Sequence, residues 1–345
     1  MHPAESRLIS EVQYNCDVSD ARFAGNYTMC VYLLKMREYY RWRHGFGFAE
    51  NLSMSDVGEW VQQTESLWET LEDRQHTPLI VDGTSCDVFD DERINQRLPD
   101  RCLFSSGIGR FGKPVFVLAE LVDVRHVDGM TVHIAGREFA RELSAPPAMI
   151  RQNRLFIRRE SLERMLWETV EEWRWHRRPG PMANVVAHYD FDRDESKALS
   201  DLLNDQLEQM LLHEVGEFRA GQLLGDDWDK LILEHAGSQV ETIARAIRDC
   251  LADCLEVIPQ LAESSRRELL DFYIAVLTPL RREMFPSIIK AYHQWLDDGS
   301  LGSIIDVAEN GRQHFESLAR ELLELHRNGL LSDALYMPHF RQQAL

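Results

Sequence analysis

A histidine and two glutamates stand close together in one short stretch of the chain, at His213, Glu214 and Glu217. If this stretch is helical, His213 and Glu217 lie on the same face, because residues four apart in a helix point the same way. Iron, manganese and zinc all accept imidazole nitrogen and carboxylate oxygen as ligands. The pair therefore predicts a metal site, with Glu214 beside it as an acid–base group.

The same spacing recurs further along the chain, where His293 and Asp297 form a His-x-x-x-Asp pair. His235 lies in another segment with helical periodicity. Helical bundles build metal sites from side chains on facing helices, so we expect His293, Asp297 or His235 to complete a centre for Fe, Mn or Zn. An alternative stays open, because a chain with 13 histidines and 57 acidic residues forms such pairs by chance. Each histidine would then pair only with its own carboxylate, at the rim of the bundle.

Two other motifs have a structural rather than a chemical interpretation. The stretch Gly107–Gly112 matches the pattern GxGxxG, but Pro114 and an extended segment follow it, where a dinucleotide site needs a helix. It therefore predicts a glycine-rich hairpin turn. The acidic stretch Asp190–Glu195 has glutamate where a calcium-binding EF-hand loop needs glycine. We expect these acids to cap the helix that follows.

Helical periodicity dominates the C-terminal half of the chain, which carries the candidate ligands. Apolar residues recur at helical spacing in five segments, at about 194–224, 227–258, 264–284, 286–298 and 303–328. Pro279 predicts a kink or a new helix within the third of them. The links between segments are short, which favours antiparallel neighbours and a bundle of four or more helices. Packing within this bundle must bring the two histidine–carboxylate pairs together if they share one metal ion.

The N-terminal half predicts a mixture of helices and strands. Helices are expected at about 18–43, from Ser55 onward and at about 158–176. Between them, short apolar runs within residues 78–136 predict a small antiparallel sheet, with Asp128-Gly129 as a hairpin turn.

These elements define the predicted fold class and the domain organisation. The fold is expected to be mostly α, of the α+β type, with an N-terminal helical pair and a small antiparallel β-sheet insert, followed by a C-terminal helical bundle. Gly180-Pro181 is a helix-breaking dipeptide. It predicts a boundary between two domains, at residues 1–180 and 181–345.

The composition bounds the location and the partners. The net charge of −19, from 38 basic and 57 acidic residues, repels nucleic-acid backbones and anionic lipid, so we expect no nucleic-acid partner. No apolar run approaches the roughly 20 residues of a membrane helix, and the N-terminus has no signal-peptide pattern. Six cysteines without a CxxC pair are typical of a reduced compartment. The chain is thus expected to be soluble and cytoplasmic.

Three aromatic residues, Tyr39, Tyr40 and Trp42, crowd one predicted helix. Consecutive helical residues point about 100° apart, so the three cannot all face one core. They either pack between two parts of the chain or form an exposed surface for a ligand or partner. The second interpretation extends to an aromatic-rich surface over residues 27 to 68.

Two hypotheses for the function follow from these patterns. The first is a metal-dependent helical-bundle enzyme that uses iron, manganese or zinc, with oxidation among its candidate reactions. The second is a non-catalytic interaction or assembly factor with an acidic, aromatic-rich surface. Its partner would be another protein or, because apolar helical bundles often self-associate, a second copy in a homodimer.

Overall fold

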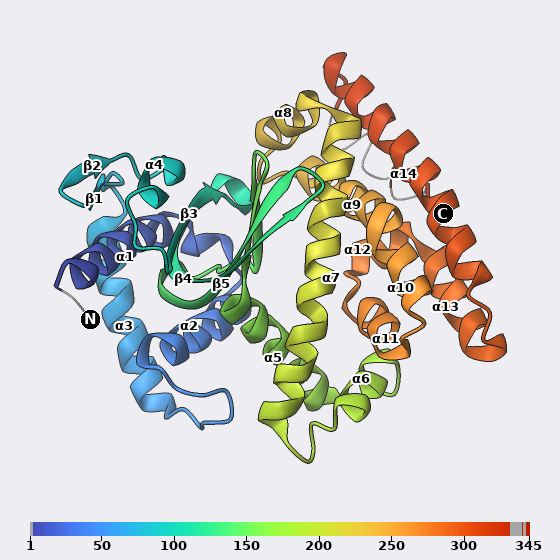
Figure 1. The fold of residues 1–345 in the computed structure, drawn as a ribbon, viewed down its shortest axis with the longest axis horizontal. Coiled ribbons are helices and arrows are strands. Elements are labelled where there is room, and N and C mark those ends of the chain that lie inside the picture. The colour runs from blue at the N-terminus through green and yellow to red at the C-terminus, as the bar shows by residue number, and fades with distance from the viewer. Residues whose placement is uncertain (1–2, 332–339, 341–342) are drawn as a thin grey trace. The chain divides into compact units, whose positions relative to one another are not determined.

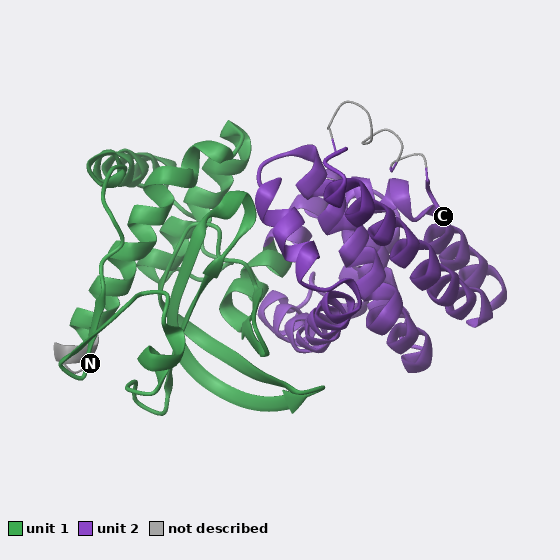
Figure 2. Cartoon of the chain, turned by 90° about the horizontal axis from the view of Figure 1, so that it is seen from above, with its two compact units in different colours: residues 1–167 green, residues 168–345 purple. Residues whose placement is uncertain are grey.

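The computed structural model describes residues 3–331, 340 and 343–345. It divides the chain into two compact units, Met1–Trp167 (unit 1) and Glu168–Leu345 (unit 2), drawn in green and purple in Figure 2. The division falls inside helix α5 (Arg159–His176), before the boundary that the sequence predicted after residue 180. The predicted fold class is confirmed: the protein is a mostly helical α+β protein with a C-terminal helical region.

Three helices rather than two open unit 1: α1 (Pro3–Phe23), α2 (Met29–His44) and α3 (Met54–Leu71). The sequence pattern missed most of α1 because polar side chains occupy part of its buried face. Asn15 is completely buried, and its amide exchanges hydrogen bonds of 2.8 and 3.1 Å with the backbone of Thr77. A polar residue satisfied in this way occupies a core position that a hydrophobic pattern does not reveal.

Unit 1 contains a two-stranded sheet and a five-stranded sheet, with the short helix α4 (Asp91–Asn95) between them in the chain. The strands are β1 (Leu79–Val81), β2 (Thr84–Cys86), β3 (Cys102–Ile108), β4 (Pro114–Val127), β5 (Met130–Arg141), β6 (Ala148–Arg151) and β7 (Arg154–Arg158). The larger sheet has the order β3-β4-β5-β7-β6, and only β5 and β7 run parallel. The long β4–β5 hairpin, which Figure 1 shows in green, turns at Asp128-Gly129 as predicted. The strands β6 and β7, which were not predicted, extend the sheet beyond residue 136.

The larger sheet curls until its two edge strands, β3 and β6, meet. Arg151 of β6 donates a hydrogen bond of 2.6 Å to the hydroxyl of Ser106 on β3. Next to it, a Cβ atom at Gly107 would lie 2.4 Å from the sulfur of Met149, so a larger residue would displace that side chain. Register shifts between Leu118 and Asp123 mark the place where β4 bends. We call the contact between β3 and β6 the seam.

Unit 2 is built from helices joined by short turns. After α5 come α6 (Pro181–Tyr189), α7 (Glu195–Leu224), α8 (Asp226–Glu234), α9 (Gln239–Ala252), the π-helical turn η3 (Asp253–Val257), α10 (Ile258–Ser264), α11 (Arg267–Val276), α12 (Pro279–Met284), α13 (Pro286–Asp298) and α14 (Gly302–Arg327). Pro279 begins a new helix, one of the two outcomes that the sequence predicted. The segment predicted as one helix at 227–258 is two, because Gly237 has a positive φ and Ser238 caps α9 by accepting the backbone N–H of Glu241 at 3.3 Å.

The long helix α7 lies against α9 and η3, and α14 packs against the same pair (Figure 1). These helices share one apolar core, in which Trp228, Phe285 and Phe315 are fully buried. Gly311 of α14 allows the close approach, since a Cβ atom there would lie 2.6 Å from the sulfur of Cys254 in η3. The core therefore fixes α7 and α9 side by side.

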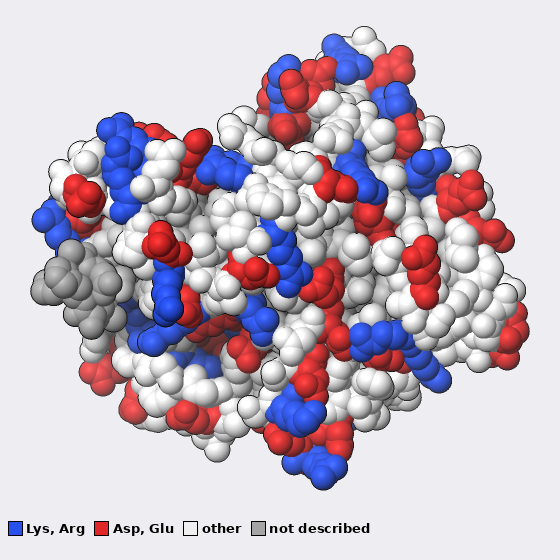
Figure 3. Space-filling model, viewed as in Figure 1, with Lys and Arg blue, Asp and Glu red and all other residues white. Residues whose placement is uncertain are grey.

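Two further observations concern the surface and the helix lengths. On the face shown in Figure 3, Lys and Arg side chains lie among Asp and Glu side chains. Within the described part of the chain, no helix combines the length and the apolar character that crossing a membrane requires.

Candidate metal centre

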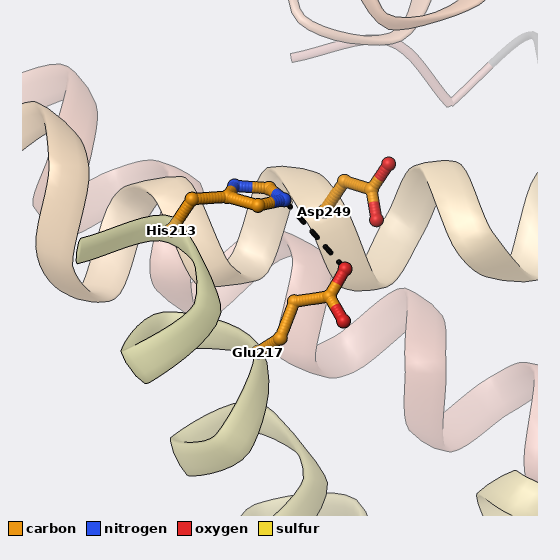
Figure 4. A group of neighbouring side chains, drawn as sticks. All are labelled: His213, Glu217 and Asp249. Carbon is orange, nitrogen blue, oxygen red and sulfur yellow. Dashed lines mark ion pairs between the residues drawn. The ribbon is translucent and has the colours of Figure 1, made fainter. Parts of the chain in front are cut away.

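His213 and Glu217 of α7 converge with Asp249 of α9 (Figure 4). One nitrogen of the imidazole and one oxygen of each carboxylate lie within 4.8 Å of one another. The Nε2 atom of His213 is 3.6 Å from Oε1 of Glu217, and these two side chains are 23% and 17% exposed. Three groups that can bind a metal thus share one partly exposed location on two neighbouring helices.

Gly216 explains how the two helices come close enough. A Cβ atom at this position would lie 2.4 Å from the carbonyl oxygen of Ala252, a distance that no real side chain tolerates. Glycine inside a helix lowers its stability by roughly 1 kcal/mol relative to alanine. The close approach of the two backbones, which leaves no room for a Cβ atom, explains why glycine is found here all the same. Since His213 and Glu217 flank Gly216 in the chain, this contact places both beside α9.

The other nitrogen of the imidazole faces Asp253, the first residue of η3. His213 Nδ1 is 2.8 Å from Oδ1 of Asp253, whose side chain is only 2% exposed. The hydroxyl of Tyr273 in α11 donates a 2.9 Å hydrogen bond to Oδ2, and Arg281 in α12 contacts the same oxygen. Turns of the π type occur often at functional sites, and this one carries a residue bonded to the candidate ligand.

Charges around the three groups are unevenly balanced. Arg248 Nη2 lies 2.8 Å from Oε2 of Glu217. Burial would raise the pKa of Glu217, but the charge of Arg248 and the imidazole of His213 outweigh it and hold that pKa well below its usual range. Burial would lower the pKa of His213, but the neighbouring Glu217, followed by Asp249 and Glu214, raises it overall. Glu217 is therefore ionised and favours a cation beside it.

The two remaining carboxyl groups of the cluster show the opposite behaviour. Burial, and then the charge of Glu217, raise the pKa of Glu214 to about 8. The same two causes raise the pKa of Asp249. Four carboxyl groups, those of Glu214, Glu217, Asp249 and Asp253, face the guanidinium groups of Arg248 and Arg281, so the cluster holds more acid than fixed positive charge. A bound divalent cation would displace protons from these carboxyl groups and would be balanced by their ionised forms.

The structure places the other three predicted ligands elsewhere. His235 lies at the C-terminal end of α8, where the centroid of its ring is 5.6 Å from the centroid of the His326 ring. His293 and Asp297 are exposed on α13, because the neighbouring Tyr292 takes the buried face of that helix. Among the described residues, the group that could hold a metal contains none of these three. The expectation that they complete the centre is not met by this geometry.

Sequence reasoning missed Asp249 and Asp253. Their spacing of four residues places both on one face of a helix, which was a usable signal. No local sequence pattern, however, predicts that this face lies against His213, because His213 and Asp253 are 40 positions apart in the chain.

The two motifs that were interpreted as structural behave as predicted. The motif Gly107–Gly112 spans the end of β3 and the turn to β4. This turn begins at Gly109 and is closed by a 2.8 Å hydrogen bond from the Gly109 N–H to the carbonyl of Lys113. Asp194 caps α7, with its carboxylate accepting the backbone N–H of Lys197 at 3.0 Å.

The aromatic residues do not form the exposed surface that the second hypothesis needs. Tyr39, Tyr40 and Trp68 are buried in unit 1, and Trp42 and Trp60 pack around them with stacked or edge-on rings. They fit together because side chains of both α1 and α3 pack against those of α2, so more than one face of α2 is covered. The surface interpretation of these aromatic side chains is therefore corrected.

Comparison with known proteins identifies the two halves of the chain. Residues 7–158 match the model described as "Family of unknown function (DUF6866) N-terminal domain", and residues 163–336 match the corresponding C-terminal domain. The candidate centre lies entirely within the second match. Neither a curated protein nor a solved structure matches the chain.

Proposed function

The chain belongs to the family of unknown function DUF6866, and we propose from the geometry of its site that it is a metal-dependent enzyme with its metal centre in unit 2. The proposed ligands are His213, Glu217 and Asp249, and the proposed metals are manganese, iron and zinc. One observation carries the proposal: a nitrogen and two carboxylate oxygens from two helices lie within 4.8 Å of one another.

The spacing of these atoms suits a metal ion after a small adjustment. Ligand atoms about 2.1 Å from one ion lie about 3 Å apart, so side-chain rotations must bring these groups closer by an ångström or two. Both helices are held by the core, and the partly exposed side chains of Glu217 and Asp249 have room to rotate toward the nitrogen of His213. Two oxygens and one nitrogen favour manganese or iron, and zinc also accepts this set.

Three protein ligands would leave positions on the ion for water or substrate. A bound metal would supply an activated water or a site for oxygen chemistry. Glu214 has a pKa of about 8 in the metal-free cluster, so its carboxyl group can hold or accept a proton near neutral pH. We assign Glu214 the role of the acid–base group at this centre.

The first test is the metal content of untagged protein purified without chelator, followed by calorimetric titration with Mn²⁺. We expect near-stoichiometric binding in the wild type and its loss in His213→Ala and Glu217→Ala. The matched controls are His293→Ala and Asp297→Ala, which remove the same spacing from an exposed helix face and should bind as the wild type does. Equal binding by all five proteins, or binding by none, would refute the proposed centre.

Catalysis needs a separate test, because metal binding alone does not make an enzyme. Metal-loaded protein is screened with hydrolytic and oxidative model substrates. An activity of this centre must disappear in His213→Ala and fall in Glu214→Gln while the metal content of Glu214→Gln is retained. An activity that Glu214→Gln leaves unchanged would exclude the acid–base role.

One observation favours a second candidate function, an interaction or assembly factor. The first turns of α2 expose Met29 to 70% and Leu33 to 51%, with Val31 and Leu34 also exposed. Contiguous exposed apolar side chains of this kind are typical of association surfaces. Light scattering over a concentration series should then show a homodimer that Leu33→Glu dissociates, while Leu233→Glu, at an exposed apolar position of α8, does not. A wild-type monomer at all concentrations would refute the homodimer.

A further inference from the structure

Asp253 holds the side of the His213 ring that faces away from Glu217. We infer that Asp253 is a positioning residue, which accepts a hydrogen bond from Nδ1–H and so keeps the lone pair of Nε2 directed at a metal ion. The inference rests on the proposed metal centre, and it assigns a role to a residue that no sequence motif indicated.

The argument begins with the chemistry of the ring. A neutral imidazole carries one N–H, and the hydrogen bonds of its two nitrogens determine which one carries it. An ionised carboxylate can only accept, so the 2.8 Å contact between Nδ1 and Oδ1 of Asp253 requires the proton on Nδ1. Nε2, the nitrogen 3.6 Å from Glu217, then has a free lone pair. Metal-binding histidines are oriented in this way by a carboxylate on the far nitrogen.

Asp253 is itself fixed in place by groups from two other helices. Tyr273 donates to Oδ2 at 2.9 Å, and Arg281 contacts the same atom. With 2% of its side chain exposed, the carboxylate has no freedom to rotate away. Because Tyr273 lies on α11 and Arg281 on α12, the orientation of the His213 ring depends on the packing of these helices against η3.

The same contacts exclude Asp253 as a metal ligand and separate it from Asp249. Each oxygen of Asp253 already faces a hydrogen-bond donor of the protein. Asp249, one turn earlier in the chain, groups with His213 and Glu217 and lies on the side of the ring nitrogen that faces Glu217 (Figure 4). The two aspartates thus serve opposite nitrogens of one imidazole.

The test uses Asp253→Asn, because an amide can donate a hydrogen bond to Nδ1 and so move the proton to Nε2. The same exchange in a Ser-His-Asp triad gives the histidine the wrong tautomer. Nitrogen-15 NMR of metal-free protein with labelled histidine, at a pH above the pKa of His213, reports which nitrogen is protonated. We expect Nδ1–H in the wild type and Nε2–H in Asp253→Asn. The affinity for Mn²⁺ should fall about 10- to 100-fold in the variant.

A second variant covers the case in which Asp253→Asn does not fold. Tyr273→Phe keeps the carboxylate but removes one of its donors, so Nδ1 should stay protonated while the Mn²⁺ affinity falls by a smaller factor. Circular dichroism and thermal unfolding establish that each variant is folded.

The two readouts separate this inference from the proposed function. If the wild type binds no Mn²⁺, the metal centre is refuted, and the NMR result alone decides whether Asp253 sets the tautomer. If Mn²⁺ binds with unchanged affinity in Asp253→Asn, or if the wild-type proton lies on Nε2, the positioning role is overturned and the metal centre stands.

Discussion

Buried charges occur in both units, but they are arranged differently. In unit 1, Arg158 lies 2.8 Å from Glu138 and 3.3 Å from Glu142, and none of these side chains is more than 1% exposed. In unit 2, the cluster around His213 and Glu217 is partly open to solvent. The first set is closed, whereas the second can be reached from outside.

The pKa values of the carboxyl groups also differ between the closed set and the open set. Burial would raise the pKa of Glu138, but Arg158 outweighs it and lowers that pKa to about 2. Burial and Glu217 instead raise the pKa of Glu214 to about 8. A matched and enclosed set of charges is costly to break, while surplus carboxyl groups near the surface favour a cation. The closed network in unit 1 thus has the features of a structural element, and the open cluster in unit 2 has those of the proposed metal centre.

The largest expected effect comes from breaking the closed network. Arg158→Met leaves Glu138 and Glu142 buried without their shared cation and should lower the free energy of unfolding by about 3–5 kcal/mol. Urea denaturation measures the loss. The control Arg125→Met removes a cation from an exposed pair with Asp123 and should cost less than about 1 kcal/mol. Similar losses in both variants would contradict the difference between closed and open charges.

Metal binding should affect one unit and not the other. Mn²⁺ at about 100 times its dissociation constant should add about 2.7 kcal/mol to the stability of unit 2. Hydrogen exchange followed by mass spectrometry should show the added protection in α7 and α9, with no change in β3–β7 of unit 1. Protection that also appears in His213→Ala would place the ion elsewhere.

A pair of glycines on α7 tests whether the cluster depends on close helix packing. Gly216→Ala inserts a methyl group against the carbonyl of Ala252 and should destabilise the protein by about 2 kcal/mol, with weaker Mn²⁺ binding. In contrast, Gly221 has no atom within 4 Å of an added Cβ, so Gly221→Ala should be neutral or stabilising by up to about 1 kcal/mol. Thermal unfolding compares them, and a harmless Gly216→Ala would refute the close-approach argument.

The smallest effect concerns Asp20, a buried carboxyl group of unit 1 whose pKa is raised, whereas that of Glu138 is lowered. Burial raises the pKa of Asp20 to about 6, although the neighbouring Lys113 lowers it. An unfolded carboxyl group titrates near pH 4, so between about 4 and 6 the folded state binds a proton that the unfolded state does not. Asp20 therefore contributes to the free energy of unfolding at low pH, and this contribution is lost as the pH rises through about 6.

The measurement compares the wild type with Asp20→Asn in urea at several pH values. From about pH 7 to pH 5 the wild type should gain about 1 kcal/mol relative to the variant. Parallel pH profiles would show that Asp20 is ionised throughout, like Glu138.

Local patterns were sufficient for part of this molecule. The pair His213 and Glu217 was visible because its geometry depends only on helical spacing. The Asp128-Gly129 turn was visible because positive φ values select these residues. In contrast, Asp249 and Asp253 join the site through the crossing of α7 and α9, and polar Asn15 obscured α1. Contacts between distant segments, and polar groups satisfied by them, leave no periodic signal.

The seam of the curled sheet has a consequence for the order of folding. Its hydrogen bond joins Ser106 and Arg151, which are 45 positions apart, whereas the β4–β5 hairpin closes over two residues at Asp128-Gly129. Closing a long loop costs more chain entropy than closing a short one, so the hairpin forms early and the seam late. Until these side chains meet, the edges of β3 and β6 are uncovered, and uncovered strand edges can pair with the edges of other chains. During synthesis, the interval before the seam closes is thus the period when unit 1 is most exposed to aggregation.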